Sequence, residues 1–148
     1  MANDTDVLLK FCEQYWEEMR HIENQRATIT NIIIVITSAI IGFIAQKGIS
    51  SNLLPLTTLL IILGIYGALT VTKLYERHQF GQVRLNHWYK RIDELNPNAQ
   101  FLQLRSVADA EHKTQHPRTE RLKLHYFWLA LHITITLLGI VITVFIII

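Results

Sequence analysis

The sequence predicts an all-α membrane protein with three transmembrane helices, long helical cytoplasmic extensions and a homo-oligomeric assembly. The 148 residues are 50% hydrophobic, and their apolar side chains gather in three long runs without a formal charge. Helical spacing of apolar residues continues beyond two of these runs, which favours helices that extend past the membrane. A single cysteine and a net charge of +2 exclude a disulfide scaffold, a polybasic nucleic-acid coat and a disordered acidic tail.

The three uncharged runs cover residues 29–46, 53–72 and 124–148. At about 1.5 Å per residue they reach roughly 27, 30 and 37 Å, and the hydrocarbon core of a bilayer is about 30 Å thick. All three are therefore expected to span the membrane. The chain then divides into an N-terminal cytoplasmic amphipathic helix (1–28), a two-helix transmembrane hairpin (29–72), a cytoplasmic helical region (73–123) and a third transmembrane helix (124–148).

The distribution of basic residues predicts the topology. Of the 14 Lys and Arg residues, only Lys47 lies between the first two spans, and the other 13 precede residue 29 or fall within 73–123. Because cytoplasmic loops carry the excess of positive charge, the N-terminus and 73–123 are expected in the cytoplasm and the C-terminus outside. No cleavable signal peptide is expected, since the first apolar run begins only at residue 29. The chain is therefore expected to cross the membrane several times.

Two extensions carry helical apolar stripes. The first is expected to run without a break into the first span, because no Gly or Pro occurs in residues 5–41; its stripe is Leu8, Phe11, Tyr15, Met19 and Ile22. The second follows the second span with the 4-3 spacing of a coiled-coil seam and should end at Pro97. Its members are Leu74, His78, Gly81, Leu85, Trp88, Ile92 and Leu95. We expect this seam to hold a homo-oligomer, for instance a tetramer.

The rest of the cytoplasmic region is expected to form one short helix over residues 98–113, with Phe101, Leu104 and Val107 facing inward. The last long helix should then open at Arg118.

A basic stripe flanks the seam. Arg77, Arg84 and Arg91 recur every seven residues, with Lys73 and Lys90 beside them. Arginine binds phosphate through a planar, bidentate fork, so one interpretation is a phosphate track that becomes a basic ring in an oligomer. The other is that these are ordinary charges beside a seam, paired with neighbouring carboxylates. A second basic cluster is expected to meet lipid head groups at the membrane boundary, and it comprises Arg118, Arg121, Lys123 and His125.

Polar and small residues form stripes inside the spans. In the third span they are His125, His132, Thr136, Gly139 and Thr143; in the first they are Asn31, Ser38, Gly42 and Ala45; in the second they are Thr57, Gly64 and Ala68. Small and hydroxyl residues allow helices to approach closely, so helix packing is one interpretation. The other is a pore lined by His132, Thr136 and Thr143, because an ionisable residue inside a membrane is a functional hypothesis by default.

Catalysis is not supported by the sequence. Arg105 and His112 loosely match the short signature of HEPN ribonucleases, and His112 and His116 have metal-like spacing without an evident third ligand. Neither a glycine-rich phosphate loop nor a G-x-S-x-G motif occurs. We therefore expect no catalytic residues, no metal and no cofactor.

The layout resembles the SLATT-like membrane effectors of bacterial antiphage systems, and is similar in particular to the channel effector of the Hailong system. The resemblance covers roughly residues 6–95, and the third span goes beyond the two-span pattern. It rests on an N-terminal helix that ends His21-Ile-Glu-Asn-Gln-Arg26-Ala-Thr-Ile-Thr30, and on a cytoplasmic helix that begins Thr72-Lys-Leu-Tyr75-Glu-Arg77-His78. The resemblance implies a homo-oligomeric, multi-pass channel in the bacterial inner membrane, so that the C-terminus is expected in the periplasm. The channel would be gated by a nucleotide or DNA signal from a partner nucleotidyltransferase, such as oligodeoxyadenylate.

The leading hypothesis is therefore an antiphage ion channel, gated through its cytoplasmic helices by an anionic nucleotide or a single-stranded DNA oligomer. Its expected partners are membrane lipids, further copies of the chain, and an oligonucleotide or cyclic nucleotide. A non-conducting membrane scaffold that recruits a soluble protein is the alternative, and a membrane-tethered HEPN nuclease ranks below both.

Overall fold

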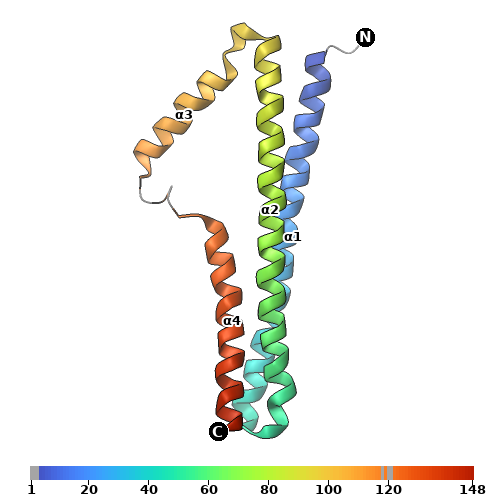
Figure 1. Ribbon diagram of the computed structural model, residues 1–148, viewed down its shortest axis with the longest axis vertical. Coiled ribbons are helices and arrows are strands. Elements are labelled where there is room, and N and C mark those ends of the chain that lie inside the picture. The colour runs from blue at the N-terminus through green and yellow to red at the C-terminus, as the bar shows by residue number, and fades with distance from the viewer. Residues whose placement is uncertain (1–3, 118, 120–121) are drawn as a thin grey trace. The chain divides into compact units, whose positions relative to one another are not determined.

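The computed structural model describes residues 4–117, 119 and 122–148, and the elements it forms there are helices, with no strand among these residues (Figure 1). In chain order they are α1 (Asp4–Lys47), η1 (Ser51–Leu53), α2 (Leu54–Leu95), η2 (Pro97–Ala99), α3 (Phe101–Gln115) and α4 (Leu124–Ile147). The all-α fold class is confirmed. The described residues fall into two compact units.

The two long helices begin in one unit and end in the other, as the sequence predicted. α1 runs for 44 residues and α2 for 42, and each joins a charged half to an apolar half without a break. α1 ends at Gly48, whose φ of 75° is the left-handed conformation that glycine adopts without steric cost. α2 ends just before Pro97, and the Asn96 N–H completes its last turn by donating to the Ile92 carbonyl at 3.0 Å.

The third helix follows after a short 3₁₀ turn. The backbone N–H of Phe101 donates to an Asp93 carboxylate oxygen at 2.7 Å, which satisfies one of the orphan donors at the start of α3. The expected inward face of α3 is wrong, because Phe101, Leu104 and Val107 are 41%, 65% and 61% exposed. α4 begins at Leu124; Arg118, where this helix was expected to open, lies outside the described residues.

The first unit, here called the polar unit, consists of the described residues of Met1–Glu23 and Glu76–Lys123. Its core joins Cys12 and Met19 of α1 to Leu85 of α2, with Trp88 and Ile92 packed against them. The Trp16 indole N–H donates to the Tyr89 hydroxyl at 2.6 Å across the same pair of helices. The apolar seam of α2 thus packs against α1 of the same chain in this unit, and oligomerisation through the seam stays a prediction.

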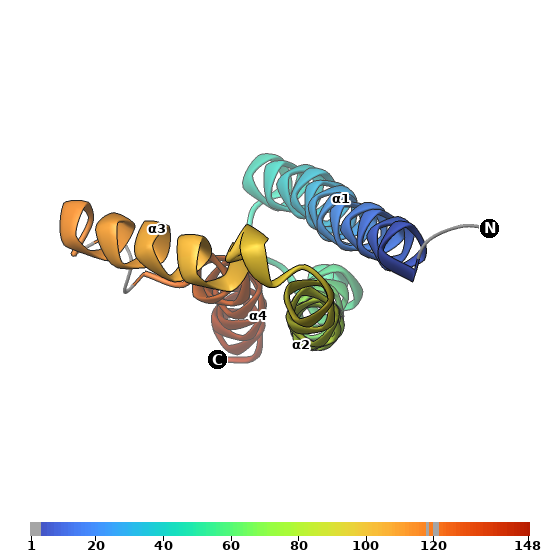
Figure 2. The same cartoon turned by 90° about the horizontal axis from the view of Figure 1, so that it is seen from above.

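The second unit, here called the membrane unit, consists of Asn24–Tyr75 and Leu124–Ile148. It contains parts of α1 and α2 and the whole of η1 and α4. Figure 2 looks along these helices. Buried positions recur with 3-4 spacing on α1 (Ile33, Thr37, Ile40, Ile44), which is the pattern of helices packed side by side. The apolar core joins Ile40, Ile44, Leu53 and Leu60, and Ile142 and Ile146 of α4 pack against it.

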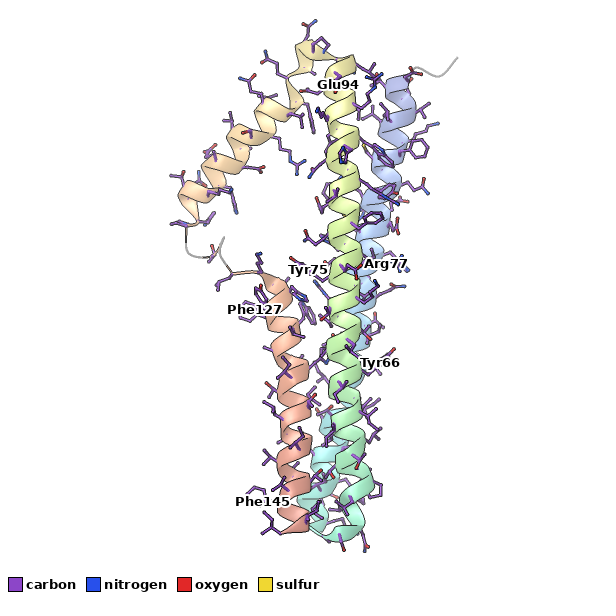
Figure 3. The ribbon with its side chains drawn as sticks, viewed as in Figure 1. Tyr66, Tyr75, Arg77, Glu94, Phe127 and Phe145 are labelled. Atoms are coloured by element: carbon purple, nitrogen blue, oxygen red, sulfur yellow. The ribbon has the colours of Figure 1, made fainter. Side chains whose placement is uncertain are left out.

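Large apolar side chains cover the outside of the membrane unit. Figure 3 shows Tyr66, Phe127 and Phe145 pointing away from the helices, and these residues are 56%, 58% and 67% exposed. α1, α2 together with η1, and α4 are each long and apolar enough to cross a membrane. An apolar exterior of this extent is suited to lipid, and the chain is a multi-pass membrane protein.

Candidate functional site

The polar unit contains a hollow of about 240 Å³ between α1 and α2. It combines two arginines with aromatic and aliphatic side chains, and its lining residues are Tyr15, Glu18, Met19, Ile22, Arg77, Phe80, Gly81 and Arg84. Gly81 keeps the helices close, since a Cβ there would lie 3.3 Å from the Met19 Cγ atom. A basic wall beside an apolar, aromatic wall is the composition that suits a phosphate attached to a planar base.

The two arginines of this hollow are held in different ways. An Arg77 Nη atom lies 3.4 Å from a Glu18 carboxylate oxygen, and both side chains are about half exposed, at 54% and 49%. Exposed pairs of this kind contribute about 0–1 kcal/mol, so Arg77 can exchange its partner for a ligand at little cost. Arg84 donates to the Tyr15 hydroxyl and stacks over the Phe80 ring at 4.0 Å, which orients its guanidinium group.

The remaining members of the predicted phosphate track do not line this hollow. Arg91 pairs with Glu94 at 2.9 Å and borders a different hollow, formed with residues near the start of α1. Lys90 is exposed in the polar unit, whereas Lys73 belongs to the membrane unit. The structure therefore brings Arg77 and Arg84 to one site, and the pairing of Arg77 and Arg91 with carboxylates agrees with the alternative of ordinary flanking charges.

The structure describes only two members of the second basic cluster, Lys123 and His125. Arg118 and Arg121 lie outside the described residues. Lys123 is exposed and belongs to the polar unit, whereas His125 belongs to the membrane unit and is only 9% exposed. The His125 ring stacks on Tyr75 at 4.0 Å, so this histidine lies within the helix packing and does not present a free surface to lipid head groups.

The polar stripe of α4 faces the interior of its own unit. His132 is fully buried, and its Nε2 atom lies 3.3 Å from the Thr30 hydroxyl of α1. The Thr136 hydroxyl donates to the His132 carbonyl at 3.0 Å, and the Thr143 hydroxyl contacts that of Thr57 at 2.8 Å. These contacts agree with the packing interpretation, and a role of this stripe in lining an oligomeric pore stays a prediction.

A different stripe remains on the outer surface of the membrane unit. Asn31, Ser38, Gly42 and Ala45 of α1 share one face, and all four are exposed. A Cβ added at Gly42 would meet no other atom within 4 Å. An exposed amide and hydroxyl in an apolar span are unfavourable against hydrocarbon, so this face suits a neighbouring subunit or water better than lipid.

Sequence reasoning gave no role to Arg26 or Thr37. Arg26 is 5% exposed, and its guanidinium carbon lies 5.2 Å from the centre of the Trp128 ring. Thr37 is 6% exposed. A signal for their burial was available, because Arg26, Ile33 and Thr37 fall in the same 3-4 register as the apolar stripe that includes Met19 and Ile22.

Two features of α3 have spacings that also occur in enzymes. Arg105 donates to the Asn86 side chain at 3.0 Å, and the His112 and His116 rings lie 4.9 Å apart. No group of three or more His, Cys, Asp or Glu side chains in the described part of the chain is placed to hold a metal ion. No family model matches the chain, and neither a curated protein nor a solved structure matches it.

Proposed function

We propose that this protein is a homo-oligomeric ion channel of the bacterial inner membrane, gated by an anionic nucleotide or single-stranded DNA oligomer that binds its cytoplasmic helices. By its resemblance to SLATT-like effectors, it acts in antiphage defence, where an open channel depolarises the infected cell. The observation that carries the proposal is the continuity of α1. This one unbroken helix supplies a wall of the basic hollow at one end and the exposed polar stripe of a membrane span at the other.

The ligand end of the proposal rests on the chemistry of the hollow. Arg77 and Arg84 supply guanidinium groups for a phosphate, and Phe80 and Tyr15 supply rings against which a base can stack. Binding would replace the weak contact between Arg77 and Glu18. Because α1 and α2 both line the hollow and both continue into the spans, a shift of one against the other reaches the membrane through the helices themselves.

The membrane end requires several subunits, since three packed helices cannot enclose an open pore for hydrated ions. The exposed face of α1 that carries Asn31 and Ser38 is the face we assign to the shared interface and the pore. The charge distribution supports the orientation, with the ligand site in the cytoplasm and residue 148 in the periplasm.

Ligand binding is tested by fluorescence anisotropy on purified protein, with labelled oligodeoxyadenylate and a labelled cyclic dinucleotide as probes. Each of Arg77→Gln and Arg84→Gln should weaken binding about ten- to a hundredfold, because a charge-assisted hydrogen bond contributes about 1.5–3 kcal/mol. Arg91→Gln is the matched control, since Arg91 lies outside the hollow and should leave affinity near wild type. Wild-type affinity in the first two variants, or binding that is insensitive to salt, contradicts the site.

A scaffold that recruits a soluble protein is the second candidate. The exposed apolar face of α3, with Leu104 and Val107 more than 60% exposed, is the observation that favours it. Under this hypothesis Leu104→Glu abolishes antiphage defence in cells, and the purified wild-type protein conducts no ions. Under the channel hypothesis the purified wild-type protein conducts without any soluble partner.

A further inference from the structure

The interior of the membrane unit contains several polar side chains among its apolar ones, which is unusual for helices that pack in lipid. Among the described residues, every buried polar or charged side chain belongs to this unit. They lie on α1, α2 and α4, and are Arg26, Thr30, Thr37, Thr57, His125 and His132. Helix packing alone is achieved with glycine, alanine and serine, and does not require two imidazoles and a guanidinium group in one core.

Contacts between helices place these groups in successive layers. Arg26 of α1 meets Trp128 of α4, one turn from His125. Thr30 then meets His132, and Thr57 of α2 meets Thr143 further along. Between these layers Thr136 hydrogen-bonds to the His132 carbonyl and faces Gly64, where a Cβ would lie 2.6 Å from the Thr136 backbone nitrogen. Polar groups therefore recur about once per helical turn along α4.

Several of these polar atoms are buried without a hydrogen-bond partner. In the membrane unit they include Nδ1 of His125, Nδ1 of His132, the Thr37 hydroxyl and the Trp128 indole nitrogen. Buried polar atoms without a protein partner are rare in proteins, and most of them either bind an ordered water molecule or serve a function. Four of them inside a single membrane unit point to water that enters the core and joins one layer to the next.

The histidines are the groups that can carry a proton along such a row. Residues 24–75 and 124–148 contain no Asp or Glu, and imidazole exchanges protons readily near neutral pH. The titratable and charged side chains on the interior faces are Arg26 on α1, Tyr75 on α2, and His125 and His132 on α4. Seven residues separate the two histidines, a rise of about 10.5 Å that a few water molecules can bridge.

We propose that each single protomer conducts protons through the interior of its membrane unit, with His132 as the proton-carrying group. A water molecule delivers a proton to Nδ1 of His132, which gives the imidazolium ion. The ring then releases its Nε2 proton towards Thr30 and the water beyond, and is left neutral in the other tautomer. Rotation of the ring then restores the starting form, so that one proton has crossed the layer in each cycle.

This inference is independent of the proposed ligand-gated pore. That pore lies between subunits and uses the exposed face of α1, whereas the proton path lies inside one subunit. Proton conduction should therefore occur without any nucleotide, and should survive a change at Asn31 that disturbs the outer face of α1. If proton conduction requires nucleotide, or is lost after a change at Asn31, the path does not lie inside one subunit as proposed.

The test is proton flux into liposomes that contain the purified protein and a pH-sensitive dye, driven by a potassium gradient with valinomycin and without added nucleotide. Wild type should acidify the lumen faster than protein-free liposomes. His132→Gln keeps a polar side chain but cannot carry the proton, so flux should fall about a hundredfold, the lower range of what a positioned acid–base group supplies. Thr136→Val should reduce flux, while Thr134→Val, the same change on the exposed face of α4, should leave it unchanged.

Three results would overturn the proposal: wild-type flux equal to that of empty liposomes, full flux in His132→Gln, or loss of flux in Asn31→Leu, which would move the path into the oligomeric pore. If His132→Gln fails to fold, ¹⁵N NMR of wild-type protein in bilayers decides the matter. Transfer of magnetisation from water to the His132 ring nitrogens is the expected result, and a ring without water contact contradicts the proposal.

Discussion

The variant Gly67→Ala tests how tightly the buried His132 ring is packed against α2. A Cβ at Gly67 would lie 2.5 Å from Cε1 and 2.7 Å from Cγ of the His132 ring, whereas ordinary contacts are 3.4–4 Å. The ring would have to move by roughly 1 Å, and it is fully buried and held by Thr30. Overpacking of this kind costs about 1–3 kcal/mol, so the free energy of unfolding should fall by that amount.

The assay is SDS titration of the purified protein in mixed micelles, followed by circular dichroism. His132→Ser removes the ring, so in that background the added methyl group of Gly67→Ala should cost little, and the double-mutant cycle should show coupling of about 0.5–3 kcal/mol. Gly42→Ala, which meets no atom within 4 Å, should leave the unfolding of the protomer unchanged. Equal stability of Gly67→Ala and Gly42→Ala, or additivity with His132→Ser, would refute this account of the core.

Three further predictions concern packing. Burial raises the pKa of the Cys12 thiol, which lies in the core of the polar unit, so maleimide should label the native protein slowly. Labelling of the Leu85→Asp variant should be at least about tenfold faster, because the carboxylate disrupts this core. Rapid labelling of the wild type contradicts this core. Asp93→Ala removes the acceptor for the Phe101 N–H. Amide hydrogen exchange at the start of α3 should then accelerate about five- to thirtyfold, which is equivalent to roughly 1–2 kcal/mol. An unchanged exchange rate would argue against a cap by Asp93. Gly42→Ile adds bulk to the outer face of α1, so the expected oligomer, measured by light scattering, should dissociate. The free energy of unfolding of the protomer should not change. An intact oligomer would instead place this face against lipid.

The helical architecture followed from the sequence because its signals are local and strong. Three long uncharged runs, the unbroken chain over 5–41 and the stop at Pro97 each act through backbone geometry or the thickness of the membrane. The prediction of an inward face on α3 was wrong because burial depends on a partner helix, which is not a local signal. Its short apolar pattern at Phe101, Leu104 and Val107 is typical of a buried stripe, but no helix of the described chain covers it.

The candidate sites were predicted only in part, because spacing along one helix does not say which helix lies opposite. The heptad spacing places Arg77, Arg84 and Arg91 on one helix, as predicted. Glu94 on the same helix pairs with Arg91, however, whereas α1 completes a hollow around Arg77 and Arg84. In the same way, the polar stripes of α1 and α4 look alike in sequence. The one that includes His132 is buried within its unit, and the one that includes Asn31 is exposed.

The most direct test of the proposed function is the current through planar bilayers that contain the purified protein, recorded while oligodeoxyadenylate is titrated on the cytoplasmic side. We expect discrete channel openings whose frequency rises with ligand concentration in the wild type and in Arg91→Gln. In the double variant Arg77→Gln with Arg84→Gln, the same openings should require about a hundredfold more ligand, because two phosphate contacts are lost. A wild-type protein that assembles in the bilayer but passes no current at any ligand concentration contradicts the channel and leaves the scaffold.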